Sequence, residues 1–142
     1  MDEIWPRGAP REGDEAARTR QVTADDIALF TRISGDTNPL HYDEELASGS
    51  RFGGIVVQGG VTTAILNALV AEDLPGPGSV FLQLNLAFLA PVRPGDTITA
   101  EGTVTWVRTD KPICELDLAV VRGDGKRVVE GHAVTYTVPL PG

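Results

Sequence analysis

The stretch VTTAILNALVAEDL, residues 61–74, carries the longest helical pattern in the chain. Its apolar side chains lie nearly all round the helix instead of along one stripe, which is typical of a helix surrounded by protein. We therefore expect residues 61–74 to form the central element of the fold. A chain of 142 residues is long enough for one domain with its own core and too short for two ordinary domains.

Several segments after this helix have the composition of β-strands. They are rich in Val, Thr, Leu and Phe, and the turn-forming sequences RPGD, TDKP and GDG separate them. The segments are residues 79–90, 97–108, 113–122 and 126–138. Short turns between them predict that consecutive strands run antiparallel. Because such a sheet can curve around one apolar helix, the sequence predicts an α+β architecture.

The residues before the central helix predict one short helix and a loose N-terminal arm. Residues 22–35, VTADDIALFTRISG, carry apolar side chains at every third position, and Thr23 followed by Asp26 resembles a capping box. We expect this helix to end at Gly35. Residues 1–18 mix both charges with Pro and Gly without any periodicity. We therefore expect a flexible arm over residues 1–18 and a single domain over residues 19–142.

The charge and cysteine content of the chain limit its partners and its compartment. A formal net charge of −8 argues against DNA or RNA as a partner, because phosphate backbones are bound by Lys and Arg. The single Cys114 allows no internal disulfide, and the N-terminal residues lack the pattern of a secretory signal. Glycines and polar residues interrupt the longest nearly apolar run, residues 53–70, so it does not predict a membrane span. We expect a cytoplasmic protein.

The stretch GDTNPLHYD, residues 35–43, gathers ionisable side chains on a turn. Asp, Asn, Gly and Pro are also common in turns that only reverse the chain, so their presence alone does not indicate a site. Here Asp36 and His41 lie on either side of Pro39, which stiffens the backbone between them. Near neutral pH a carboxylate accepts protons and an imidazole both accepts and donates them. Such a pair can activate a water molecule for addition to a double bond.

Further segments follow this turn in an order that is typical of one family. They are, after GDTNPLHYD, the sequences IVVQGGV, the long helix, LAFLAPVRPGDTI, RTDKPI and GHAVTYTV. Over residues 19–138 the chain resembles the MaoC-like family of single-domain R-specific enoyl-CoA hydratases. The resemblance implies the hot-dog fold, in which a curved antiparallel sheet wraps around a long central helix. It also implies a hydro-lyase that catalyses reversible syn hydration of trans-2-enoyl thioesters to R-3-hydroxyacyl thioesters.

The resemblance assigns roles to residues of the turn. Asp36 and His41 match the catalytic pair of the family, which holds and activates the hydrating water. Asn38 matches the asparagine that supports the turn, and we expect its role to be structural. Asp43 lies just outside this group, and we expect it to cap the helical turn that follows.

The sequence QGGV at the start of the central helix is the candidate thioester-binding segment. Backbone N–H groups there have no intrahelical partner and lie at the positive end of the helix dipole, so an enolate oxygen is stabilised beside them. By the resemblance, the Gly59 N–H contacts the thioester carbonyl, and Gly60 stands where the family usually carries a larger apolar residue. The family commonly has His where this chain has Gln58. We expect Gln58 to support the loop by hydrogen bonds, although it cannot titrate near neutral pH.

Other functions on the same fold are a dehydratase acting on carrier-protein-bound 3-hydroxyacyl or polyketide intermediates, a thioesterase, and a non-catalytic acyl-thioester-binding subunit. Hot-dog thioesterases commonly place a carboxylate on the central helix, whereas Glu72 and Asp73 lie only at its end, which disfavours hydrolysis. The intact pair of Asp36 and His41 disfavours a simple binder. The net negative charge favours free acyl-CoA over an acidic carrier protein.

The expected partner is an acyl-CoA or acyl-carrier-protein thioester, and the CoA or phosphopantetheine comes with it, so we expect no separate cofactor. Two separated histidines and one cysteine provide no zinc-ligand spacing, and we expect no metal. The edges of a sheet must be covered or paired, and the resemblance implies a homodimer with a continuous sheet. Charged loop residues are more often solvated surface than CoA contacts, and the candidates for such contacts are Arg51, Arg93, Arg108 and Lys111.

Overall fold

The computed structural model describes residues 4–141 and contains a five-stranded antiparallel sheet. Its strands are β1 (Glu15–Gln21), β2 (Ser79–Phe88), β3 (Thr97–Val107), β4 (Ile113–Arg122) and β5 (Arg127–Thr137). Their order across the sheet is β1-β3-β4-β5-β2. All four strands predicted from the sequence are confirmed, and their predicted ends differ from the observed ends by no more than two residues. Together with the helices, the sheet confirms the predicted α+β class.

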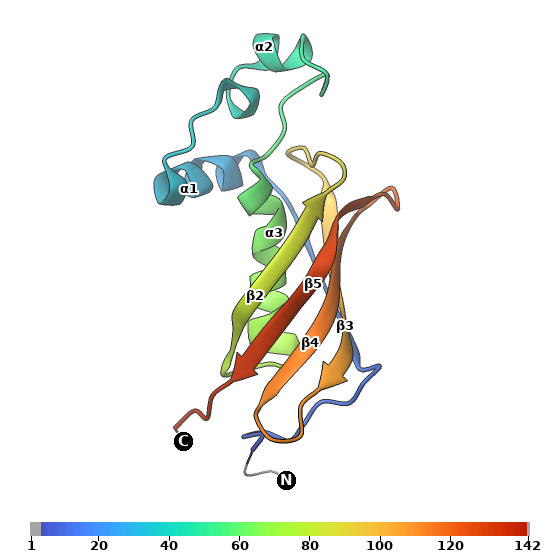
Figure 1. The fold of residues 1–142 in the computed structure, drawn as a ribbon. Coiled ribbons are helices and arrows are strands. Elements are labelled where there is room, and N and C mark those ends of the chain that lie inside the picture. Colours follow the sequence, from blue (N-terminus) through green and yellow to red (C-terminus); the bar gives the residue numbers. More distant parts are fainter. Residues whose placement is uncertain (1–3, 142) are drawn as a thin grey trace.

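Helix α3 (Gly59–Ala68) lies along the concave side of the curved sheet and is the predicted central element (Figure 1). The helix continues as a wider π-helical turn over Leu69–Asp73. Leu66 and Leu69 are completely buried, as are Leu116 on β4 and Val129 on β5. These side chains belong to one apolar cluster, so the core of the domain lies between α3 and the sheet.

The elements between β1 and α3 form a separate layer beyond one end of the sheet (Figure 1). They are α1 (Ala24–Ser34), the 3-10 turn η1 (Pro39–His41) and α2 (Glu44–Ser48). Helix α1 begins as predicted, because the Thr23 N–H donates to the Asp26 carboxylate at 2.8 Å. It ends as predicted at Gly35, whose φ of 80° is readily adopted only by glycine. Over residues 4–141, no helix is long and apolar enough to cross a lipid bilayer.

The predicted flexible arm does not match the structure over much of its length. Residues 15–18 belong to β1, which pairs with β3 so that Glu15 lies opposite Thr103. Trp5 is 4% exposed and packs in the core, so this part of the predicted arm is docked as well. The predicted boundary between residues 18 and 19 therefore falls inside a strand. The sequence did not indicate strand β1, because its side chains are mostly polar and the strand is held by backbone hydrogen bonds to its neighbour at the edge of the sheet. Residues 1–3 lie outside the described part of the chain.

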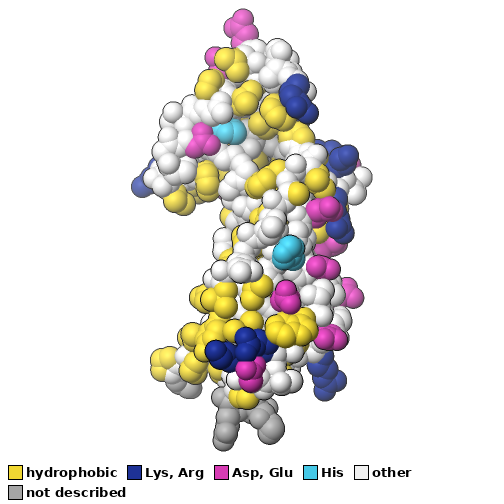
Figure 2. Space-filling model, in the orientation of Figure 1, with side chains coloured by type: hydrophobic (Ala, Val, Ile, Leu, Met, Phe, Trp, Pro, Cys, Tyr) yellow, Lys and Arg dark blue, Asp and Glu magenta, His cyan; other side chains and the backbone are white. Residues whose placement is uncertain are grey.

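Strand β2 lies at the edge of the sheet next to β5, not next to β3, which follows it in the chain. The four predicted strands, β2 to β5, do alternate in direction along the chain, as predicted, but only β3, β4 and β5 form consecutive hairpins. The edge strand exposes large apolar side chains, with Val80 and Leu82 each 53% exposed and Leu84 43% exposed. Figure 2 shows exposed hydrophobic side chains toward the lower end of this face, below the narrow middle of the molecule.

Candidate active site

The turn between α1 and α2 is held by hydrogen bonds from its own residues. The Asn38 N–H donates to Asp36 Oδ1 at 3.0 Å, and Asn38 Oδ1 accepts from the Leu40 N–H at 3.1 Å. Pro39 occupies the first position of η1, where a helical turn needs no N–H. Asn38 thus holds the turn through its backbone N–H and its side-chain oxygen. Asp43 lies as predicted, because its carboxylate caps α2 by accepting from the Leu46 N–H at 3.1 Å.

This turn brings Asp36 and His41 together. Asp36 Oδ2 and His41 Nε2 are 3.5 Å apart, although five positions separate the two residues in the sequence. The His41 side chain is 10% exposed and the Asp36 side chain is 37% exposed. The imidazole is thus mostly enclosed, whereas the carboxylate stays accessible to water.

The hydrogen bond of His41 Nδ1 determines which ring nitrogen can accept a proton from water. His41 Nδ1 lies 2.6 Å from the backbone carbonyl of Val56. A carbonyl oxygen only accepts hydrogen bonds, so Nδ1 must carry the proton. In the neutral ring the lone pair is then on Nε2, which is the atom that faces Asp36. Two hydrogen-bond acceptors therefore face each other, and a water molecule can donate one proton to each of them.

The QGG segment lies at the beginning of α3, and Gln58 and Gly59 have different surroundings. Gln58 is 2% exposed and donates from Nε2 to the Ile27 carbonyl at 3.0 Å, so it supports the fold instead of facing the cavity. Gly59 is the first residue of α3, and its N–H has no acceptor among the described residues. Gly59 is exposed, so this N–H is available to a bound molecule.

His41 and Gly59 line one apolar cavity of about 410 Å³. A cavity of this size falls within the range that binds small organic ligands. Phe88, from the far end of β2, covers Gly59, because a Cβ added to Gly59 would lie 2.9 Å from its ring. The other lining residues come from the turn, the approach to α3, α3 itself and the β2–β3 connection, and are Leu40, Arg51, Phe52, Val56, Val57, Thr62, Leu89, Ala90, Pro91 and Val92.

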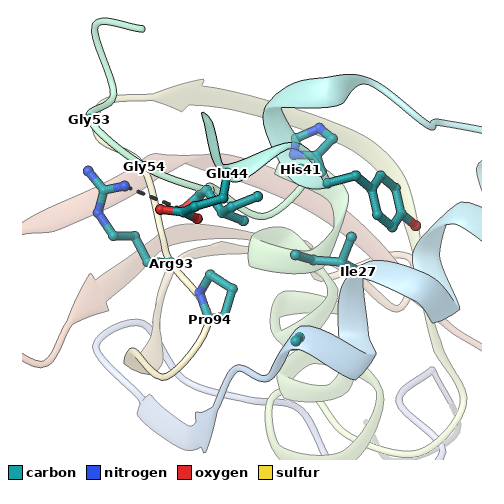
Figure 3. A pocket seen from close by; sticks show the side chains of 10 residues that line it. Ile27, His41, Glu44, Gly53, Gly54, Arg93 and Pro94 are labelled. Atoms are coloured by element: carbon teal, nitrogen blue, oxygen red, sulfur yellow. Dashed lines mark hydrogen bonds between the residues drawn. The ribbon is translucent and has the colours of Figure 1, made fainter. Parts of the chain in front are cut away.

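A second, more open cavity of about 760 Å³ also reaches His41 (Figure 3). Arg93 and Glu44 line it together with the backbone around Gly54, and Figure 3 shows both side chains beside that loop. The Arg93 guanidinium donates to the carbonyls of Phe52 and, at 3.3 Å, Ile55. Arg93 thus fixes the loop that leads to α3.

Gly60 differs from Gly59 in its surroundings. A Cβ added to Gly60 would lie 2.0 Å from the Phe30 ring of α1, so the aromatic ring occupies the space of a side chain at this position. Gly60 is not among the residues that line the cavity shared by His41 and Gly59. The structure therefore places Gly60 in the contact between α1 and α3, and its predicted thioester-binding role stays a prediction.

The remaining candidates lie apart from this cavity. Asp73 pairs with Arg18 at 2.8 Å, and Arg108 pairs with Asp110 at 2.7 Å. His132 is exposed on β5, where its strand neighbour is Asp117 on β4. Within residues 4–141, no three His, Cys, Asp or Glu side chains gather in a way that would hold a metal ion.

Residues from neighbouring elements contact the site, and the sequence did not indicate them. Thr31 on α1 bonds the backbone of Asp36 at 2.7 Å, and Tyr42 contacts the same hydroxyl. Phe88 arrives from β2. No periodicity connects these positions with the turn, although a threonine four positions after the buried Ile27, on the same face of α1, was a signal that it contacts something polar.

Comparison with known proteins shows the family to which the chain belongs. A family model described as MaoC like domain matches residues 8–121. An (R)-specific enoyl-CoA hydratase from Aeromonas caviae is 37% identical over 129 residues, which cover 91% of this chain and 94% of that protein. A mitochondrial 3-hydroxyacyl-[acyl-carrier-protein] dehydratase from Solanum lycopersicum is 30% identical, with 91% of this chain and 76% of that protein covered.

Solved structures show the same fold. An (R)-hydratase from A. caviae involved in PHA biosynthesis superposes with a TM-score of 0.86 at 35% identity, covering 91% of this chain and 98% of that chain. An R-hydratase from Pseudomonas aeruginosa in the unliganded form gives a TM-score of 0.85 at 31% identity, covering 92% and 84%. These likenesses confirm the predicted hot-dog fold.

Proposed function

The chain belongs to the MaoC-like domain family, and from this we propose that it is a hydro-lyase for the reversible syn hydration of trans-2-enoyl thioesters to R-3-hydroxyacyl thioesters. The observation that carries the proposal is the orientation of His41. Its Nδ1–H donates a hydrogen bond to the Val56 carbonyl, and its Nε2 lies 3.5 Å from Asp36 Oδ2. Two acceptors are therefore directed at one place beside an apolar cavity.

The proposed reaction begins with a water held between Asp36 Oδ2 and His41 Nε2. The water oxygen bonds to the β-carbon of the substrate while one of its protons passes to Nε2, and the double-bond electrons move to the thioester oxygen. Asp36 stabilises the imidazolium that forms. The proton then passes from Nε2 to the α-carbon as the thioester carbonyl is restored. Hydroxyl and proton arrive from the same side, which makes the addition syn, and every step is reversible.

The negative charge on the thioester oxygen needs a hydrogen-bond donor. We assign this role to the N–H of the exposed Gly59, which has no acceptor among residues 4–141 and lies at the positive end of the α3 dipole. Glycine lets the substrate approach this backbone closely. The acyl chain would lie against the apolar walls of the cavity, which include Phe88 and Val57.

The substrate carrier is proposed to be CoA, so that no further cofactor takes part. The net charge of −8 disfavours an acidic carrier protein. Arg51 lines the same cavity, and the structure gives it no acidic partner among the described residues. The 30% identical carrier-protein dehydratase supports the alternative, a dehydratase for carrier-bound 3-hydroxyacyl groups. A cytoplasmic location is proposed from the sequence.

Hydrolysis and simple binding have less support. Asp73, a carboxylate at the end of the central helix, is engaged by Arg18 and so is not free to activate water. A non-catalytic binder would not need the hydrogen bond that fixes the His41 tautomer.

A homodimer is part of the proposal. The free edge of β2 offers unpaired backbone groups, and Leu82 and Leu84 are about half exposed there. Pairing of two such edges would make the sheet continuous and cover these side chains. Phe88 lies at the end of the same strand, so the interface would adjoin the cavity.

The proposal is tested by following the loss of the enoyl-thioester absorbance with crotonyl-CoA and a longer trans-2-enoyl-CoA. Wild type should form the R-3-hydroxyacyl product, and Asp36→Asn and His41→Ala should each lower kcat by about 100-fold or more. The chain offers matched controls in Asp43→Asn, which keeps an α2 cap, and His132→Ala, on the sheet. Both should retain activity. A wild type that leaves enoyl-CoA unchanged but reacts with enoyl carrier protein would establish the alternative, and inactivity on both would refute the hydratase.

A further inference from the structure

The hydroxyl of Thr31 lies where three segments of the site meet. Thr31 Oγ1 is 2.7 Å from the backbone carbonyl of Asp36 and 3.2 Å from Nε2 of Gln58, and it also contacts the Tyr42 hydroxyl. Thr31 belongs to α1. Asp36 lies in the turn that carries the proposed catalytic pair, and Tyr42 lies at the end of that turn. Gln58 directly precedes α3. One side chain therefore contacts every segment that supplies a proposed catalytic group.

The direction of each hydrogen bond follows from the chemistry of the partners. A threonine hydroxyl has one proton to donate and two lone pairs. The Asp36 carbonyl only accepts, so it takes the proton, and the Gln58 nitrogen only donates, so it uses one lone pair. The Tyr42 O–H must then donate to the other lone pair. The hydrogen-bonding capacity of Thr31 is completely used.

The orientation of Gln58 agrees with this assignment. Its Nε2 donates both to Thr31 and to the Ile27 carbonyl, at 3.2 and 3.0 Å. A reversed amide would direct Oε1 at the Ile27 carbonyl, which would be repulsive. The observed orientation leaves Oε1 buried and without a donor among the described residues, so the two Nε2 bonds are what fixes the side chain.

We propose that Thr31 is a positioning residue that sets the Asp36–His41 pair relative to the Gly59 N–H. It holds the backbone of Asp36 directly, and it reaches His41 and Gly59 through their chain neighbours, Tyr42 and Gln58. The inference rests on the proposed function, because it assigns Thr31 to that reaction. Thr31 does not line the cavity with His41 and Gly59, so its effect is on geometry and not on substrate contact.

The test compares Thr31→Val, which keeps the shape and removes the hydroxyl, with Thr31→Ser, which keeps the hydroxyl. Thr31→Val should lower kcat by about ten-fold or more with little change in KM, because the reacting groups lose their alignment while the cavity is unchanged. Thr31→Ser should recover most of this loss. Tyr42→Phe removes a single donor to Thr31 and leaves the Asp36 bond, so its effect should be smaller.

Thr105→Val is the matched control for loss of a threonine hydrogen bond. Thr105 Oγ1 donates to the Glu115 carbonyl at 3.2 Å on the sheet, away from the site. Thr105→Val should leave kcat unchanged. The proposal is overturned if Thr31→Val keeps wild-type kcat, or if Thr31→Ser loses as much as Thr31→Val.

Amide hydrogen exchange supplies a readout that needs no substrate. The His41 N–H donates to the Asn38 carbonyl at 2.9 Å inside the turn. It should exchange faster in Thr31→Val than in wild type and Thr31→Ser, and equal rates in all three would overturn the positioning role. An inactive wild type with the expected exchange pattern would refute the proposed function while leaving the role of Thr31 in holding the turn intact.

Discussion

At the scale of single residues, the two adjacent glycines of the α3 entrance meet different neighbours. A Cβ on Gly59 would approach the Phe88 ring at 2.9 Å, and Phe88 is 60% exposed and can move. A Cβ on Gly60 would overlap the Phe30 ring at 2.0 Å, and Phe30 packs against the core. The same added methyl group should therefore affect function at one position and stability at the other.

Gly60→Ala should lower the free energy of unfolding by about 1–3 kcal/mol, because the ring of Phe30 has to leave its place. Gly59→Ala should change that free energy by less than about 0.5 kcal/mol and should lower enoyl-CoA hydration, because the methyl group intrudes between the backbone donor and the cavity. Urea denaturation and the absorbance assay measure the two effects. Equal stability of the two variants would show that Phe30 does not restrict position 60.

The sequence predicted the local part of the site and missed the part made by tertiary contacts. Asp36, Asn38 and His41 lie within one turn, so spacing and turn chemistry were enough to bring them together. The contact of Thr31 with Gln58 joins positions 27 residues apart, and neither segment contains a pattern that predicts this contact. Such contacts depend on how α1 packs on α3, which a pattern within one segment does not specify.

At the scale of elements, α1 is fixed at its start by a carboxylate whose ionisation matters. Burial alone would raise the pKa of Asp26, but hydrogen bonds from Thr23 and Arg20 outweigh it, and the pKa lies below its ordinary value of 3.8. The ionised form is therefore favoured by folding. Its contribution to stability is complete above the unfolded pKa and is lost as the pH falls below 3.8 through the lower, folded value.

Asp26→Asn should therefore destabilise the protein by about 1 kcal/mol near neutral pH, since it weakens the cap of α1 and the Arg20 pair. The difference from wild type should shrink as the pH falls below 3.8 and through the lowered pKa of Asp26, because the carboxyl group of wild type then becomes protonated too. Urea denaturation of both proteins at each pH measures this difference in the free energy of unfolding. A difference that is independent of pH would contradict the role of the charge.

Element types were predictable where side chains alternate between core and solvent. Residues 113–118 alternate in this way, and they form the first part of β4. Strand β1, EAARTRQ, is mostly polar and is held by backbone pairing to β3, so its sequence resembles a loop. The π-helical end of α3 was likewise not visible in a pattern that only indicated a buried helix.

At the scale of the whole molecule, the position of β2 at the edge of the sheet predicts assembly. Leu84→Glu should convert the proposed homodimer to a monomer, because a charge would be buried between two β2 edges. Trp106→Glu is the control, since Trp106 is 43% exposed like Leu84 but lies on β3. Light scattering after size-exclusion chromatography distinguishes the outcomes. A monomeric wild type, or a Leu84→Glu variant that stays dimeric, would exclude this interface.

In the proposed mechanism, one water held by Asp36 and His41 adds both its oxygen and its proton from one side of the substrate. Hydration of crotonyl-CoA in D₂O, with the product analysed by proton NMR, tests it most directly. The expected result is an R-3-hydroxyacyl product with a single deuterium at the α-carbon, on the same face as the new hydroxyl. A deuterium on the opposite face, or an S hydroxyl, would contradict it.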